Sequence, residues 1–384
     1  MNTQDKFRIA KKMIEKQSNN IFSCSEHSTF TKFSLAKRLL SNIEDIQNKS
    51  FLVIYNTELV ISLIEDYNVD PNKVTFYCDH LNKAHAVNVF NIPKSNIHYI
   101  KELSKFLSKE SLNMKFDVIV GNPPYKNNLH LKILSKLSNN CDVLSFIQPS
   151  IPFLDRRDKN KYKEELNNIQ LPLASIQVVN SANAFPDAKI QSPVAITYFD
   201  KSHQNKSVRY ENEMTKVLTN TQEPDLFTGL PGYSSLHNRF FNLEKSKSIK
   251  SLKLKNRDIL NEDNFYVSLP SLRGNVGDTN KFYKNDFFTY YANKKIRVKN
   301  STETILTKNE NFEFKTKEQA QNFIDYLNTK FARTILLLRK RDFHPKFDST
   351  PIVDWNVKWS DDMLFTHFKL SNQEIEFINT NEFI

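Results

Sequence analysis

The chain has 384 residues, 39% of them hydrophobic and 25% charged, a balance that favours a globular protein over a disordered or fibrous one. Lys and Arg outnumber Asp and Glu by 54 to 43, and the resulting net charge of +11 favours a polyanionic partner. The three cysteines match no disulfide or metal spacing, so we expect no metal and a reducing, cytoplasmic setting. We expect no signal peptide and no contact with a membrane, because no apolar run reaches the length of a membrane span.

The first half of the chain alternates short apolar runs with segments of helical spacing. The runs predict strands at 51–55, 74–79, 116–120, 143–147, 176–179 and 194–199. The intervening patterns predict helices over 3–16, 35–43, 59–64, 100–107 and 129–137. Strands separated by helices indicate an α/β domain with a mostly parallel sheet, whose ligands bind at the carboxyl ends of the strands. Because residues 201–224 are polar and lose periodicity, we place this domain at residues 1–205.

The second half, residues 206–384, is less regular and predicts a mixed α+β domain. A strand-like run covers 265–269. Thr316 and Gln319 form a capping-box signature, which predicts one helix that continues to Leu338. Ser371 and Glu374 form a second such signature near the C-terminus.

One stretch has an unusual chemical character: the apolar run that begins at Phe116 continues into Gly121-Asn122-Pro123-Pro124-Tyr125. Two prolines end the hydrogen bonding of the strand, and the first of them keeps Asn122 out of the helical region. The strand end therefore presents an amide, a carbonyl and an aromatic face in set directions.

These groups suit the methylation of an amine attached to a ring. The lone pair of such an amine is delocalised into the ring, and acceptors for both of its hydrogens release that lone pair. The side-chain oxygen of Asn122 and the carbonyl of Pro123 are two such acceptors, and Tyr125 offers a stacking surface. A base inside a duplex must first be flipped out at a cost of a few kcal/mol. A second aromatic wall would offset part of that cost, and Phe185 is the candidate.

Polar residues also follow two other predicted strands, at Tyr55-Asn56-Thr57-Glu58 and at Asp79. Since carboxyl ends of parallel strands meet at one edge of a sheet, we expect these residues to lie near Asn122. The first 120 residues contain no glycine. A ligand-binding loop there must do without the residue that lets a backbone approach a ligand most closely.

Gly121-Asn122-Pro123-Pro124-Tyr125 resembles the catalytic motif of the S-adenosylmethionine-dependent DNA N6-adenine methyltransferases. The order of parts is similar to the gamma class, and the C-terminal run from Tyr326 to Ile375 resembles the Eco57I-like modification methylases. The resemblance implies a Rossmann-like class I methyltransferase domain followed by a DNA target recognition domain. It also implies that Asn122, Pro123, Pro124 and Tyr125 are catalytic, and that Tyr125 and Phe185 stack on a flipped adenine. The cofactor contacts that it implies are Thr31, Asp79 and Asn122.

The family normally carries a glycine-rich loop after its first strand, but this chain has Tyr55-Asn56-Thr57-Glu58. Either Asn56 and Glu58 bind S-adenosylmethionine instead, or the cofactor site is weakened. The second alternative corresponds to a cofactor-impaired methyltransferase-fold protein that serves as a DNA-binding or anti-restriction factor. A third alternative is an RNA or protein methyltransferase, because related motifs occur in such enzymes.

Basic residues interleaved with aromatic ones between Lys281 and Lys299 predict contact with the phosphates of double-stranded DNA. The DNA-binding candidates are Arg273, Lys294, Lys295, Arg297 and Lys299. The recognition sequence cannot be read from these residues, and the oligomeric state is left open, although a monomer would suffice.

Overall fold

A computed structural model describes residues 31, 33–78, 84, 87–100, 114–154, 159–179, 184–185, 194–205, 207–213, 216–222, 224, 228–241, 243–254, 261, 263–269, 298–300, 310–339 and 347–380. The chain divides into two compact units, Met1–Leu226 and Phe227–Ile384. Each unit is described by itself.

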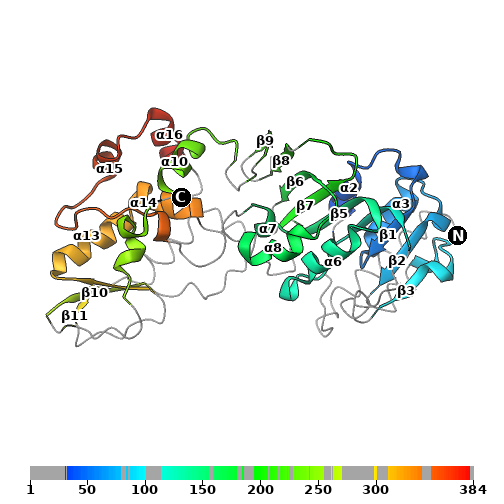
Figure 1. Ribbon diagram of the computed structural model, residues 1–384, viewed down its shortest axis with the longest axis horizontal. Coiled ribbons are helices and arrows are strands. Elements are labelled where there is room, and N and C mark those ends of the chain that lie inside the picture. Colours follow the sequence, from blue (N-terminus) through cyan, green and yellow to red (C-terminus); the bar gives the residue numbers. More distant parts are fainter. Residues whose placement is uncertain are drawn as a thin grey trace. The chain divides into compact units, whose positions relative to one another are not determined.

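The first unit is built on a nine-stranded sheet in the order β3-β2-β1-β4-β5-β7-β6-β8-β9 (Figure 1). Its strands are β1 (Phe51–Ile54), β2 (Val74–Cys78), β3 (Ile97–Tyr99), β4 (Phe116–Gly121), β5 (Cys141–Pro149), β6 (Leu173–Val179), β7 (Val194–Asp200), β8 (Val208–Asn212) and β9 (Val217–Thr221). Strands β3, β2, β1, β4 and β5 pair in parallel, whereas β7 is antiparallel to both β5 and β6. Strand β8 pairs with β6 in parallel, and β9 pairs with β8 antiparallel.

Helices surround this sheet because its central strands are apolar on both faces. All four residues of β1 and all five residues of β2 are buried, as expected for parallel strands covered on both sides. The described helices are α2 (Phe33–Leu40), α3 (Thr57–Glu65), α6 (Leu129–Leu137), α7 (Ile151–Leu154) and α8 (Lys159–Asn167). Helix α2 packs against α3 and β5, while α6 packs against α8.

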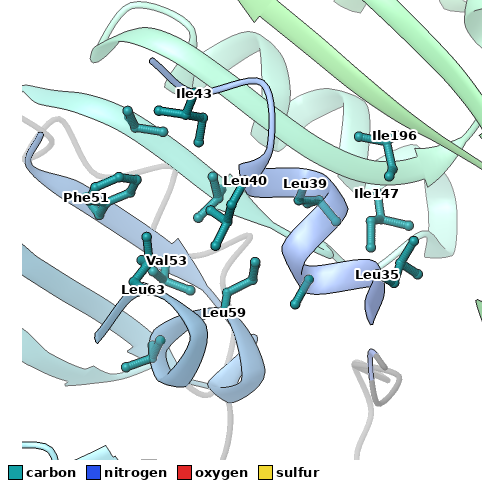
Figure 2. Close-up of a cluster of buried hydrophobic side chains, with 14 of the residues drawn as sticks. Leu35, Leu39, Leu40, Ile43, Phe51, Val53, Leu59, Leu63, Ile147 and Ile196 are labelled. Atoms are coloured by element: carbon teal, nitrogen blue, oxygen red, sulfur yellow. The ribbon is translucent and has the colours of Figure 1, made fainter. Parts of the chain in front are cut away.

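Helix α2 buries one side of its cylinder in the core of this unit. Figure 2 shows Leu35 and Leu39 facing Ile147 and Ile196 of the sheet. Leu40 points instead toward a group of apolar side chains from β1 and α3 (Figure 2). Full burial of a leucine side chain contributes roughly 1.5–3 kcal/mol. Thr31, which is buried, lies two residues before the start of this helix.

The structure confirms the predicted fold class of the first half. The order β3-β2-β1-β4-β5-β7-β6, with β7 antiparallel to its two neighbours, is that of the Rossmann-like class I methyltransferase fold. The extent of the unit differs from the sequence-based division after residue 205, because β8 and β9 extend the same sheet and the unit runs to Leu226. In β8, buried residues alternate with more exposed ones, a period-2 signal within a segment that reads as polar overall.

The second unit combines a small sheet with helices. Its antiparallel strands lie in the order β11-β10-β12, with bounds β10 (Phe265–Leu269), β11 (Val298–Asn300) and β12 (Glu310–Phe314). Its helices are α10 (Tyr233–Phe240), α13 (Lys317–Leu327), α14 (Lys330–Arg339), α15 (Asp361–His367) and α16 (Asn372–Thr380). The mixed α+β content agrees with the sequence analysis, and the role of this unit in recognition stays a prediction.

Both predicted capping signatures begin helices. The Thr316 hydroxyl accepts the N–H of Gln319 at 3.1 Å, and Glu374 and Ser371 bond reciprocally at 2.7 and 3.3 Å. The prediction of one helix through Leu338 is wrong, because the chain ends α13 at Leu327 and starts α14 at Lys330. No helix in the described part of the chain is long and apolar enough to cross a membrane.

Candidate active site

The Asn-Pro-Pro-Tyr box lies at the carboxyl end of β4, beside the carboxyl end of β1. Strand order changes direction between these two strands, and ligands of open α/β sheets bind outside such a switch point. The backbones are close here: Gly121 pairs with Ile54, and a Cβ atom on Gly121 would lie 2.8 Å from the Ile54 carbonyl oxygen. Gly121 therefore brings the box against the loop that follows β1.

A closed set of hydrogen bonds joins the box to that loop and to Thr31. The backbone N–H of Asn122 donates to Asn56 Oδ1 at 2.6 Å. The Thr31 hydroxyl accepts both Asn56 Nδ2 at 2.8 Å and Asn122 Nδ2 at 3.3 Å. Asn122 Oδ1 accepts the Tyr125 hydroxyl at 2.6 Å. The structure thus brings together four residues that the sequence analysis proposed, and Thr31, Asn56 and Asn122 are all buried.

Tyr55 occupies the position where the resemblance leads one to expect a glycine-rich loop. Its φ of 66° lies in the left-handed region, which is uncommon for a bulky side chain. The side chain is 1% exposed, and the backbone N–H donates to the Tyr77 carbonyl at 2.8 Å. Strain of this kind costs about 1–3 kcal/mol and tends to cluster at functional sites. Tyr55 therefore makes the sharp turn without the freedom of a glycine.

An acid follows in the first turn of α3. Glu58 is buried, and its Oε1 accepts the backbone N–H of Thr31 at 3.4 Å. The N-terminus of a helix favours negative charge, so the position suits a carboxylate. The neighbouring Thr57 Oγ1 is buried and has no hydrogen-bond partner within the described residues. This end of β1 therefore offers a carboxylate and an unused hydroxyl to a polar ligand.

Tyr125 also contacts His130, a residue that the sequence analysis did not select. The two rings meet edge to face, with centroids 5.7 Å apart. Burial raises the pKa of Tyr125 above its usual range, so its hydroxyl stays protonated and can donate. Burial lowers the pKa of His130 to about 4, although the nearby Tyr125 backbone acts in the opposite direction. Within the described residues neither ring nitrogen of His130 has a hydrogen-bond partner.

The sequence does contain a signal for His130. It precedes Ile133, Leu134 and Leu137 at helical spacing on the buried side of α6. An ionisable residue on an apolar stripe, next in the chain to the Asn-Pro-Pro-Tyr box, is a candidate for a perturbed pKa.

Phe185 lies in the hydrophobic core of the first unit. It is 1% exposed and belongs to the same cluster as Leu35, Ile147 and Val194. Stacking on a base would therefore require the Phe185 side chain to leave the core. The stacking role stays a prediction.

Several predicted site residues lie outside the described part of the chain. These are Asp79, Arg273, Lys294, Lys295 and Arg297. Lys299 falls in β11, of which only the backbone is described. The predicted helix over 3–16 and all but the first residue of the predicted helix over 100–107 also lie outside the described residues.

The first unit has the fold of the class I methyltransferases. Comparison with known families gives a more particular assignment: residues 19–157 match the Eco57I restriction-modification methylase family. The matched segment includes Thr31, the loop after β1 and the whole box. It covers less than half of the chain. A search of curated proteins found no match.

Among solved structures, one similar chain is the methyltransferase subunit of a type I restriction-modification system from Streptococcus thermophilus. It has 12% identity and a TM-score of 0.40, with 52% of this chain and 50% of that chain covered. A modification subunit assigned to a type I restriction enzyme of Vibrio vulnificus has 13% identity and a TM-score of 0.41, with 67% and 63% covered. A protein of Listeria monocytogenes assigned as a class I S-adenosylmethionine-dependent methyltransferase has 14% identity and a TM-score of 0.41, with 55% and 75% covered. The alignment thus spans about half the length of the first of these proteins.

Proposed function

We propose that the protein is a site-specific DNA adenine N6-methyltransferase of the gamma class. The observation that carries this proposal is the strand-end box, in which Asn122 and Pro123 are presented at the switch point of the sheet. The net charge of +11 and the basic residues near 273–299 support DNA as the substrate, with the second unit as the recognition domain.

The residues after β1 have a donor set that fits the methionine end of S-adenosylmethionine. Glu58 offers a buried carboxylate to the ammonium group, and next to it in sequence is the Thr57 hydroxyl, which has no hydrogen-bond partner among the described residues. Thr31 and Asn56 add polar atoms on the side of Asn122. Asp79, which follows Cys78 in the sequence, is the candidate for the ribose hydroxyls. When bound, the cofactor supplies an electrophilic methyl group on a sulfonium.

Asn122 and Pro123 act on the amine. A carboxamide oxygen can accept two hydrogen bonds, so Asn122 Oδ1 can hold the Tyr125 hydroxyl and still accept one N–H of the adenine amine. The Pro123 carbonyl accepts the other N–H. These two bonds draw the nitrogen toward tetrahedral geometry and direct its lone pair at the methyl group. The methylated amine is positively charged and loses its proton readily, so this chemistry requires no strong base.

Tyr125 holds the base in place. Its side chain is only partly buried, unlike Asn122, and so can offer a ring surface to an extrahelical adenine. Stacking on an aromatic side chain contributes roughly 1–3 kcal/mol per base, which is of the same order as the cost of flipping. Phe185 would form the opposite wall after it leaves the core.

A second candidate function has a specific observation in its favour. The loop after β1 contains a left-handed Tyr55 in place of glycine, and the side chains of Asn56 and Thr31 bond to the box itself. A protein with this loop and no affinity for S-adenosylmethionine would act as a DNA-binding or anti-restriction factor. Calorimetric titration with S-adenosylmethionine distinguishes the two, since micromolar binding excludes the second.

Methyl transfer tests the proposal directly. Purified protein is incubated with labelled S-adenosylmethionine and a mixture of unmethylated plasmid and phage DNA, which presents many short sequences. We expect label in N6-methyladenine, and we expect Asn122→Ala to lower the rate by at least about 100-fold, as for loss of a transition-state contact. Asn212→Ala, which alters a fully buried asparagine on β8, is the matched control for loss of a buried carboxamide.

Two outcomes would contradict the proposal. If the wild-type protein labels no DNA and binds no cofactor, the methyltransferase assignment fails. If label appears only in RNA or protein supplied in parallel, the substrate assignment fails. Long-read sequencing of DNA from cells that express the gene would give the recognition sequence.

A further inference from the structure

The backbone N–H of Asn122 requires a hydrogen-bond acceptor from outside its own strand. Strand β4 ends at Gly121, and Pro123 and Pro124 have no N–H. Between Gly121 and Tyr125, Asn122 therefore carries the only backbone donor that can anchor the box. That N–H is buried, and a buried donor without a partner is costly. Its acceptor is a side chain 66 positions earlier in the sequence, Asn56 Oδ1, at 2.6 Å.

This bond decides the orientation of the Asn56 carboxamide. A backbone N–H can only donate, so the oxygen of Asn56 must face Asn122 and its NH2 group must face the other way. The NH2 group then meets the Thr31 hydroxyl at 2.8 Å. The same hydroxyl accepts the NH2 group of Asn122 at 3.3 Å, which turns the Asn122 oxygen toward Tyr125. The direction of the Asn122 side chain, on which the proposed chemistry depends, is thus set by the orientation of the Asn56 carboxamide.

We propose that Asn56 is a positioning residue: its carboxamide anchors the backbone of Asn122 and, through Thr31, sets the direction in which Asn122 presents its oxygen. The inference rests on the proposed function for its effect on turnover, whereas the hydrogen bonds themselves can be tested without turnover. It assigns to Asn56 a role on the amine side of the site in place of a contact with the cofactor. In the loop after β1, where the family normally has glycines, this chain thus has a side chain that bonds to the Asn122 backbone.

The chain offers a direct probe of the Asn122 N–H. Only two glycines are followed by asparagine, Gly121 and Gly274. Protein labelled with carbonyl ¹³C in glycine and ¹⁵N in asparagine therefore gives two amide signals selected by their Gly–Asn coupling. The variant Asn275→Ser removes one of them and identifies the other as Asn122. Hydrogen exchange of that signal measures how firmly its N–H is held.

The test compares Asn56→Leu, of similar size but without polar atoms, with Asn56→Asp, which keeps an acceptor for the Asn122 N–H. We expect Asn56→Leu to speed exchange of the Asn122 amide at least about tenfold and to lower kcat by at least about tenfold, the equivalent of one hydrogen bond. We expect the dissociation constant of S-adenosylmethionine to change less than about twofold, because the lost bond is to Asn122. Asn56→Asp should restore the slow exchange in large part.

Three further variants separate loss of this bond from loss of folding. Asn212→Leu is the matched control, a buried asparagine on β8 of the same unit, and it should leave exchange at Asn122 as in the wild type. Thr31→Val removes the acceptor of both carboxamides without changing the side-chain shape. It should speed exchange at Asn122, and Thr31→Ser, which retains the hydroxyl, should do so less.

The outcomes separate this inference from the proposed function. If Asn56→Leu leaves exchange at Asn122 unchanged, or if the cofactor dissociation constant rises as much as kcat falls, the positioning role is overturned. If the wild-type protein transfers no methyl group but exchange responds as expected, the proposed function fails while the anchor of Asn122 stands.

Discussion

His130 is the side chain next to the box whose titration should be visible in the stability of the protein. Burial lowers its pKa in the folded protein to about 4, against 6.5 for the free side chain. Between these values the unfolded chain binds a proton that the folded chain does not, so stability falls as the pH is lowered from 6.5 toward 4. The shift corresponds to about 3 kcal/mol.

Replacement of His130 by Phe should remove this dependence while it keeps an aromatic ring against Tyr125. Urea unfolding at pH 7, 6, 5 and 4 would measure the free energy of unfolding. The wild type should lose more stability than His130→Phe over this range. A control, His367→Gln, which alters an exposed side chain on α15, should lose as much as the wild type. Equal slopes in the wild type and His130→Phe would show that His130 is not held neutral.

The residues of the site differ in how far their positions could be predicted from the sequence. Asn122, Tyr125, Thr31 and Glu58 were accessible because they stand in a motif or at a strand end. The bond from Asn122 to Asn56 was not, because it joins a backbone group to a side chain across the fold. Likewise, the left-handed φ of Tyr55 could not be predicted, because it is set by the turn between β1 and α3 and tyrosine rarely adopts such a φ.

At the scale of elements, the close approach of β1 and β4 should be sensitive to a single methyl group. A Cβ on Gly121 would lie 2.8 Å from the Ile54 carbonyl oxygen and 2.9 Å from its Cβ, distances that require one strand to move. We expect Gly121→Ala to lower the free energy of unfolding by about 1–3 kcal/mol, as for other overpacked sites. Because Asn122 follows directly, methyl transfer should also fall.

Chemical denaturation and the methyl-transfer assay would test this expectation. Gly232→Ala makes the same chemical change in the second unit, where φ is +79° and the added Cβ would meet the Gln373 backbone. It should reduce stability without affecting binding of S-adenosylmethionine. Stability of Gly121→Ala within about 0.5 kcal/mol of the wild type would argue against the close approach, since that range is typical of surface changes.

Elements with a clear pattern in their own sequence were predictable, and element boundaries that depend on distant contacts were not. The central strands are uniform apolar runs, so β1, β2 and β4 could be located to within a residue. The break between α13 and α14 could not, because part of its cause lies far along the chain. The carboxylate of Asp361, the first residue of α15, accepts the N–H groups of Lys330 and Phe331 at 3.1 and 2.8 Å. Together with the Thr329 hydroxyl, which accepts the N–H of Ala332, it caps α14 and makes a new helix start favourable.

At the scale of the whole molecule, charge is the property that the sequence determines most directly. Lys and Arg exceed Asp and Glu by 11, and the proposed DNA contacts near residues 273–299 are basic. Each neutralised phosphate releases counterions, so log K for DNA binding should fall linearly with log salt concentration, with a slope of about −0.9 per contact. With six to ten contacts, affinity should drop by about 10³ to 10⁵ between 50 and 200 mM salt.

Fluorescence anisotropy with an unmethylated duplex, at a series of sodium chloride concentrations, would measure this slope. The double substitution Lys294→Ala and Lys295→Ala should make the slope shallower by about 2, because each lost phosphate contact removes about one unit. Lys201→Ala is the control, since this exposed lysine pairs with Asp142 at 2.9 Å in the first unit and should leave the slope unchanged. A slope near zero in the wild type would exclude phosphate contact as the source of affinity. An unchanged slope in the double variant would move the DNA-binding surface away from these two lysines.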